Sequence, residues 1–427
     1  MAEMEVFERR VADTLAWCAA DVSLAVDAVA VAHRVALEHP RRRARALPWG
    51  PVAVSRLAWA LLLAGLLLAL VVGSLMVGAR RPDHAVVVAP SPTPLAACPP
   101  GSTPDEPGAV DEARPPASEY VGPMVWNGAA GRMVLLATET WADFVRRRDL
   151  TSTSVMPGRV TWTLDVCTNR WHQGRVSTAL PDSGAGPGTL VYDEDSDATL
   201  LIADDLFVWS YDLGADTWTR RGGATPRWIT QAVYDPVSGL VLGRGGTNDE
   251  MWTYDVDADT WREVDQGDMV PPRQGNSGFE FMSFDRSADR LVLYRDSGTW
   301  LFDPRVRTWA KVSTSVPIWF FIGGDGMIYD EGSERTIIYG QGSVAAFDAG
   351  TSTWELLYGT GTWGQGGDSR FDRGAGWAIA YDPLNERVVV VGGTVWSAEL
   401  NGWQPVDDVV AFDPLTRSWI ELLAPGP

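Results

Sequence analysis

An eight-residue frame that recurs six times constrains the fold of this chain more than any other feature. The frame has Asp at its second position and Trp at its eighth. Its copies read LDVCTNRW at 164–171, YDLGADTW at 211–218, YDVDADTW at 254–261, FDPRVRTW at 302–309, FDAGTSTW at 347–354 and FDPLTRSW at 412–419. Successive copies start 43 to 48 residues apart, except for the last, which follows after 65. A period in this range indicates a repeat architecture built from equivalent units.

A second frame precedes each copy and opens with an aromatic residue followed by Asp or Asn. It runs through a tight turn into a β-branched stretch. Its copies are VWNGAAGRMVLL, VYDEDSDATLL, VYDPVSGLVLG, SFDRSADRLVLY, IYDEGSERTIIY and AYDPLNERVVVV. Each unit therefore reads as strand, tight turn, strand, loop, strand, tight turn, strand.

The third unit also has an arginine before its first strand and the pair Gly245-Gly246 after its second. With these residues the chain resembles the kelch repeat, whose units each form a four-stranded blade of a β-propeller, and bacterial proteins likened to the central domain of galactose oxidase. The resemblance implies an all-β fold, a six-bladed kelch-like β-propeller over residues 119–427. Units 1, 4 and 5 lack the glycine pair. The many prolines of residues 82–118 argue against a seventh blade.

The conserved positions of the eight-residue frame are expected to be structural. A blade has two apolar faces that only neighbouring blades can bury, so the tryptophans should pack between blades. Each Asp should accept backbone N–H groups within its turn. These structural residues are Asp165, Trp171, Asp212, Trp218, Asp255, Trp261, Asp303, Trp309, Asp348, Trp354, Asp413 and Trp419.

Residues 57–79 form an uncharged run of 23 mostly apolar residues. At about 1.5 Å per residue this run covers about 34 Å, enough for a hydrocarbon core of about 30 Å. It lies too far from the N-terminus for a cleaved signal peptide, and arginines are more frequent before it than after it. We therefore expect a cytoplasmic helical segment at 1–50, one transmembrane helix in the cell membrane, and a Pro-rich extracytoplasmic linker at 80–118.

Charge and cysteine content bear on partners and compartment. From Pro82 onward there are 25 basic and 48 acidic residues, which disfavours a nucleic-acid partner. Cys98 and Cys167 both follow the predicted span, so an oxidising compartment would allow a disulfide between them. The alternative is a pair of free, small side chains.

The alternating acids Asp255, Asp257 and Asp259 suggest an oxygen-ligand loop for calcium, but the repeat argues against one. Other copies replace the second and third acids, and Arg307 and Arg417 stand where Asp259 stands. A position that accepts arginine is not a cation ligand. We expect Asp255 and Trp261 to be structural, the remaining acids of this copy to be incidental, and no metal to be bound.

Enzymatic chemistry has little support in the residue types. His172 is the only histidine and Cys167 the only cysteine after residue 118. One histidine is too few for the ligands of a copper-radical oxidase or of a His-rich zinc site, and it disfavours a Ser-His-Asp triad. We therefore expect no cofactor. A pair of acids for glycoside hydrolysis stays open, because an acidic propeller can bring many carboxylates together.

Loop lengths point instead to a recognition surface. The turns joining strands 1–2 and 3–4 are short in every unit, whereas insertions occur at 138–160, 355–374 and 394–408. In a closed ring these three loops should meet on one face. Exposed aromatics with arginines on variable loops are typical of binding surfaces, and the alternative is that they pack over the closure of the ring. The candidate ligand-binding residues are Trp141, Arg146, Arg147, Arg148, Trp363, Trp396 and Trp403.

These observations predict an envelope-anchored extracytoplasmic recognition module for a protein, peptide or glycan ligand. One alternative is a transmembrane sensor of the anti-sigma type, although His33 is not followed by the cysteines of that family's zinc form. The other is a carbohydrate-active enzyme.

Overall fold

The computed structural model describes residues 97–105, 113–118, 121–138, 159–177, 180, 188–203, 205–245, 249–267, 269–272, 280–295, 298–313, 326–340, 342–360, 371–374, 376–397, 399 and 401–426. The chain divides into two units, Met1–Ala89 and Pro90–Pro427, and the described residues belong to the second. The segments predicted at 1–50 and 57–79 lie outside them. No helix among the described residues has the length and apolar character needed to cross a membrane.

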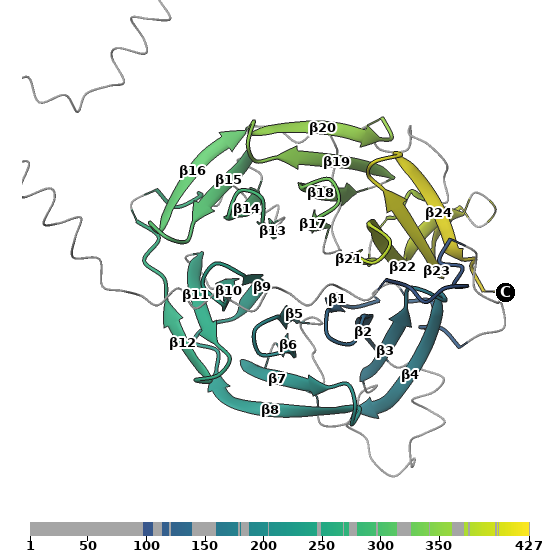
Figure 1. Cartoon of the computed structure of the whole chain (residues 1–427), viewed down its shortest axis with the longest axis horizontal. Coiled ribbons are helices and arrows are strands. Elements are labelled where there is room, and N and C mark those ends of the chain that lie inside the picture. The colour runs from purple at the N-terminus through teal and green to yellow at the C-terminus, as the bar shows by residue number, and fades with distance from the viewer. Residues whose placement is uncertain are drawn as a thin grey trace, which may run out of the picture. The chain divides into compact units, whose positions relative to one another are not determined.

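The described residues form six four-stranded antiparallel sheets arranged as blades around a centre (Figure 1). Blades 1 to 3 consist of β1 (Met124–Asn127), β2 (Arg132–Thr138), β3 (Arg159–Asp165), β4 (Arg170–Ser177), β5 (Thr189–Asp193), β6 (Ala198–Ile202), β7 (Phe207–Asp212), β8 (Thr217–Ala224), β9 (Ile229–Asp235), β10 (Leu240–Gly245), β11 (Glu250–Asp255) and β12 (Thr260–Glu263). Blades 4 to 6 consist of β13 (Glu280–Asp285), β14 (Arg290–Arg295), β15 (Gly298–Asp303), β16 (Thr308–Ser313), β17 (Met327–Asp330), β18 (Arg335–Gly340), β19 (Ser343–Asp348), β20 (Thr353–Tyr358), β21 (Ala378–Asp382), β22 (Arg387–Ser397), β23 (Gly402–Asp413) and β24 (Ser418–Leu423).

Strand order within each blade follows the chain, with the first strand innermost and the fourth at the rim (Figure 1). Each blade is built from one continuous stretch, and β1 of the first blade lies against β21 of the last. Apolar clusters fill the spaces between neighbours; one of them joins Leu135 and Trp162 of blade 1 to Val389 and Ala411 of blade 6. The prediction of an all-β, six-bladed propeller is confirmed.

The four-residue turns after the frame Asp residues explain the most constant part of the repeat. In all six, the Asp side chain accepts a backbone N–H two or three residues later, at 2.8 to 3.0 Å. The last turn residue has positive φ, between 52° and 58°, a region that Asn and Asp tolerate better than most residues. These positive-φ residues are Asn169, Asp216, Asp259, Arg307, Ser352 and Arg417.

The frame tryptophans lie on the outermost strands, between their own blade and the preceding one. The indole N–H of Trp218 donates to Thr161 Oγ1 at 2.8 Å, and that of Trp354 donates to Thr299 Oγ1 at 2.7 Å. Both acceptors are on the third strand of the preceding blade, where the tryptophan ring also buries apolar surface. Trp309 instead donates to Gln266, in the link that leaves blade 3, at 3.0 Å. The other three are packed in apolar clusters that each span two blades: Trp171, Trp261 and Trp419.

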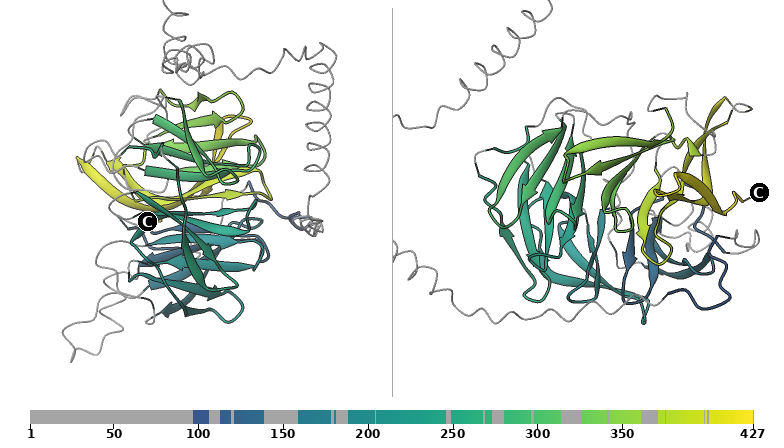
Figure 2. Two further views of the ribbon diagram at one scale, coloured as in Figure 1. Left: turned by 90° about the vertical axis from the view of Figure 1, so that its left-hand side faces the viewer. Right: turned by 45° about the horizontal axis from the view of Figure 1, so that its top comes forward.

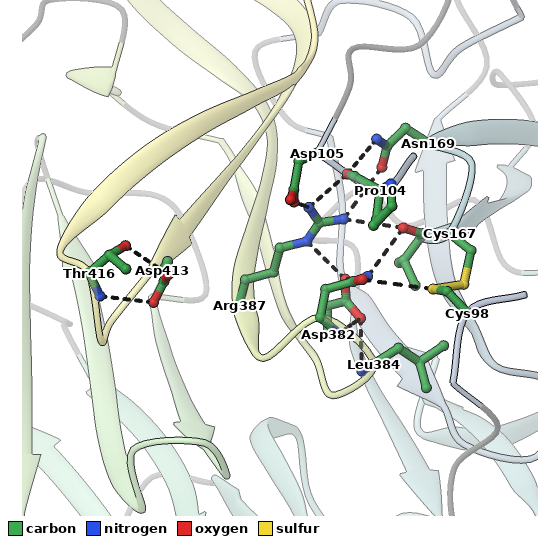
Figure 3. A network of polar contacts seen from close by, with 12 residues as sticks. Cys98, Pro104, Asp105, Cys167, Asn169, Asp382, Leu384, Arg387, Asp413 and Thr416 are labelled. Carbon is green, nitrogen blue, oxygen red and sulfur yellow. Dashed lines mark hydrogen bonds and ion pairs between the residues drawn. A yellow bond between two sulfur atoms is a disulfide. The ribbon is translucent and has the colours of Figure 1, made fainter. Parts of the chain in front are cut away.

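Two faces of the ring differ. The turn face carries the turns that join the first to the second and the third to the fourth strand of every blade; the loop face carries the other connections. On the turn face, residues 97–105 cross from blade 1 to blade 6 and are held by the Cys98–Cys167 disulfide, with sulfurs 1.99 Å apart (Figure 3). We call residues 97–105 the clasp.

Arg387 is the second attachment of the clasp (Figure 3). This arginine is 1% exposed and donates from Nη1 to Pro104 O at 2.8 Å, from Nη2 to Val166 O at 3.2 Å, and from Nε to Asp382 at 3.0 Å. Asn169 donates to Pro104 O at 2.8 Å from the blade 1 side. On the turn face, the seam between the first and last blades is therefore covered by the clasp, which a disulfide joins to blade 1 and the buried Arg387 joins to blade 6. No strand among the described residues is shared between the two ends.

Residues 394–408 are predicted as a loop, but residues 394–397 extend β22 and residues 402–408 extend β23. These strands have 11 and 12 residues, whereas strands of the other blades have 4 to 8. Their pairing continues to Trp396↔Trp403 and Ser397↔Gly402, after a register shift between Val391 and Gly393. Gly392 and Gly393 have φ of 60° and 91°, so the glycine pair of this unit provides the bulge. The ribbon, olive to yellow, reaches past its neighbours on one side of the ring (Figure 2).

Candidate functional site

The projecting ribbon of β22 and β23 brings together two of the predicted binding residues. The rings of Trp396 and Trp403 lie edge to face, with centroids 5.7 Å apart and planes at 76°. They are cross-strand partners, so their side chains emerge on the same face of the ribbon. Trp396 is 48% exposed, which is uncommon for so large an apolar side chain. We call this pair the tryptophan pair.

Trp403 is less exposed because it covers the link that enters blade 6. A Cβ added at Gly374 would lie 2.6 Å from its ring, so this close approach requires glycine. The backbone N–H of Gly374 donates to Thr394 O at 2.8 Å, and Arg373 forms a β-bridge with Val395. The ribbon thus has a third backbone segment at its base, which limits its freedom to move as a hinge.

A buried ion pair lies beneath this third segment. Arg373 is fully buried, and its Nη2 lies 2.7 Å from Oδ2 of Asp408, whose side chain is 5% exposed. Arg373 Nε and Nη1 and Asp408 Oδ1 have no hydrogen-bond partner among the described residues, so within this part of the chain the pair is incompletely satisfied. Burial outweighs the opposing effect of Arg373 and raises the pKa of Asp408 above its usual range. A pair of this kind fixes geometry at some cost in stability.

The link is also anchored to blade 5. The Tyr339 hydroxyl donates to Phe371 O at 2.5 Å, and the Phe371 ring stacks on Trp419 with centroids 4.8 Å apart. Arg373 and Asp408, which hold the base of the ribbon, were not predicted, because they are 35 residues apart and share no motif. The remaining predicted residues lie outside the described residues: Trp141, Arg146, Arg147, Arg148 and Trp363.

The expectation that only Asp255 among the acids of YDVDADTW matters is wrong for Asp259. Its carboxylate accepts the Tyr254 hydroxyl at 2.5 Å and the backbone N–H of Gly222, on the outer strand of blade 2, at 2.7 Å. Arg221 Nε lies 3.6 Å away. Although burial opposes the shift, these partners hold the pKa of Asp259 below its usual value. Asp259 therefore links blade 2 to blade 3.

The same link occurs one blade earlier. Asp216 accepts the Tyr211 hydroxyl at 2.8 Å and the backbone N–H of Arg175, in blade 1, at 2.6 Å. A comparison of the copies would have revealed this signal, because Asp stands at the sixth frame position only where Tyr stands at the first. Copies that start with Phe have Arg or Ser there. Within the described part of the chain, no three His, Cys, Asp or Glu side chains are grouped to hold a metal ion.

Comparisons with known proteins show a likeness of fold. No protein-family model matches the chain, and no curated protein matches it. One similar solved structure is a protein of unknown function from Bacteroides thetaiotaomicron, with 12% identity, 70% of this chain and 74% of that chain covered, and a TM-score of 0.42. YjhT has 13% identity, covers 73% and 99%, and has a TM-score of 0.46. A third is a fungal alcohol oxidase of the AA5 family in complex with copper, with 14% identity, 74% of this chain and 68% of that chain covered, and a TM-score of 0.43. At these values the likeness carries no argument about activity.

Proposed function

We propose that this protein is an envelope-anchored, extracytoplasmic recognition module on a kelch-like propeller, and that its ligand binds at the tryptophan pair on the loop face. The ligand class is a protein, peptide or glycan. The Trp396–Trp403 pair on a projecting ribbon, with Trp396 exposed, is the observation that carries the proposal.

The geometry of the ribbon supports a binding role. Tryptophan contributes a large rigid surface at small entropic cost and is frequent among the residues that dominate binding energy. An edge-to-face pair leaves one ring free to stack on a planar or sugar-like group. The buried Arg373–Asp408 pair and the Gly374 contact hold the ribbon before any ligand arrives. Such preorganisation lowers the entropic cost of binding.

The location in the proposal rests on two further observations. Residues 57–79 are long and apolar enough to span a bilayer. The Cys98–Cys167 disulfide supports an oxidising compartment for the propeller. The position of the ligand site has separate support, because the clasp lies on the turn face and does not cover the ribbon on the loop face.

The proposal is tested by binding of the full-length chain to arrays of soluble oligosaccharides and of synthetic peptides. We expect ligands whose binding falls at least tenfold in the variants Trp396→Ala and Trp403→Ala. Trp228→Ala is the matched control, because Trp228 is 51% exposed but lies in the link before β9. Equal binding by the wild type and both ribbon variants would contradict the proposal, and so would an equal loss in the control. Breakdown of a bound oligosaccharide would reassign the protein as an enzyme.

A further inference from the structure

A second candidate site lies at the centre of the ring, apart from the ribbon. The innermost strands of all six blades, β1, β5, β9, β13, β17 and β21, surround a cavity of about 220 Å³. This volume is below the 300–1,000 Å³ typical of sites for drug-sized ligands, so it fits a group the size of one side chain. The lining is largely apolar and aromatic, and Trp126 and Tyr234 belong to it.

The turn-face opening of this cavity carries three charged side chains. Arg286, in the turn after β13, donates from Nη1 to Glu194 Oε2 at 3.2 Å and also donates from Nη2 to the same carboxylate. Its Nε lies 3.4 Å from Glu331 Oε1. Glu194 belongs to blade 2 and Arg286 to blade 4, so the contact joins blades that are not neighbours and crosses the opening.

The position that these residues occupy varies among the six turns that join the first and second strands. Each directly follows the Asp that ends the first strand, and in the other three blades this position holds Gly128, Pro236 and Pro383. The preceding Asp residues are buried and cap the turn, so the turn itself does not require a charge after them. Turn formation therefore does not explain the charges of Glu194, Arg286 and Glu331.

A contribution to folding stability does not explain the ion pairs of Arg286 with Glu194 and Glu331 either. The side chains of Arg286, Glu194 and Glu331 are 36%, 42% and 46% exposed, and ion pairs with this exposure contribute little to folding. Burial and the nearby Asp195 and Glu194 carboxylates raise the pKa of Tyr234, as an electronegative opening should. Two carboxylates against one guanidinium leave this opening with a net negative charge.

We propose that the turn-face opening of the central cavity is a binding site for an organic cation, a guanidinium or primary ammonium on a short apolar stem, and that Arg286 occupies it from within the chain. Glu194 and Glu331 hold the cationic group. The aromatic and apolar wall of the cavity takes the stem, while the two carboxylates form charge-assisted hydrogen bonds with the cationic group. A ligand must displace Arg286, which lowers its apparent affinity, because the vacant site is the minor state.

The test measures binding of butylguanidinium and of butylammonium to the full-length chain by calorimetry. In Arg286→Gln we expect both probes to bind at least tenfold more tightly than in the wild type, because the internal competitor is removed. Adding Glu194→Gln and Glu331→Gln to that variant should abolish the gain. Arg305→Gln is the matched control. Arg305 pairs with Asp289 on the same blade as Arg286, and its side chain is 57% exposed and lies away from the cavity.

Binding to Arg286→Gln that is no tighter than to the wild type would overturn the proposal. An equal gain in Arg305→Gln would also overturn it, because it would show general attraction of cations to an acidic protein. Variants of Trp396 and Trp403 should leave probe binding unchanged, which separates this site from the one on the ribbon.

Discussion

The turn face is built from residues that recur in every unit, whereas the ribbon is built from residues that depart from the repeat. On the turn face, six outer turns share one length, one Asp cap and one positive-φ residue, and even the clasp is attached through turn residues such as Cys167. On the loop face, blade 6 is the one blade whose described middle strands reach 11 and 12 residues, and it places two tryptophans at their end. The difference teaches that the repeated positions build the ring, whereas the ribbon, which departs from the repeat, carries the surface that we propose for recognition.

The largest predicted effect on the turn face comes from Arg387. Replacing it by alanine leaves the fully buried Asp382 without its cationic partner and removes the contacts to Pro104 and Val166. We expect Arg387→Ala to lower the free energy of unfolding by about 3–5 kcal/mol, as for other buried pairs that lose one member. Urea unfolding at pH 7 measures this loss.

The pH dependence of the Arg387→Ala variant follows from Asp382. Burial already raises the pKa of Asp382 in the folded protein, with Arg387 acting in the opposite direction. Without Arg387 the folded-state pKa rises further, so the folded protein binds a proton that the unfolded chain has released. The stability of the variant should fall as pH rises from about 4 through that pKa. Arg335→Ala, which breaks the exposed pair with Glu355, is the control and should cost less than about 1 kcal/mol. A similar loss in both variants would contradict this account of the seam.

The disulfide should have a slightly smaller effect. Cys98 and Cys167 are 69 residues apart, and a crosslink over such a loop stabilises by about 2–4 kcal/mol, chiefly by restricting the unfolded chain. We expect that loss in the double variant Cys98→Ser with Cys167→Ser. Reduction of the wild type should give the same urea midpoint as the double variant. An unchanged midpoint in both would show that the clasp is not part of the closed seam.

Sequence reasoning reached the local features of the fold and missed the contacts between distant residues. The frame Asp and Trp positions, the strand order and the uniform turns could be deduced because each depends on residues a few positions apart and recurs in every unit. The link from Asp259 to Gly222 was missed because each copy was compared with the others by residue type alone, without the Tyr that accompanies the Asp.

The candidate sites needed the three-dimensional ring. The repeat predicts a loop at 394–408, since no other described blade offers a strand extension with a glycine bulge for comparison. Arg286 and Glu194 are 92 residues apart and meet only because blades 2 and 4 face the same opening. No pattern along the chain signals a contact across the axis, because its geometry depends on how many blades close the ring.

The most direct test of the division between ring and recognition surface compares two tryptophans by urea unfolding. Trp171 is 5% exposed between blades, and Trp171→Ala should lower the free energy of unfolding by about 3–5 kcal/mol. Trp396 is 48% exposed on the ribbon, and Trp396→Ala should change it by less than about 0.5 kcal/mol. A loss of unfolding free energy in Trp396→Ala as large as that in Trp171→Ala would contradict the account. It would show that Trp396 packs the seam of the ring and is not an exposed residue available to a ligand.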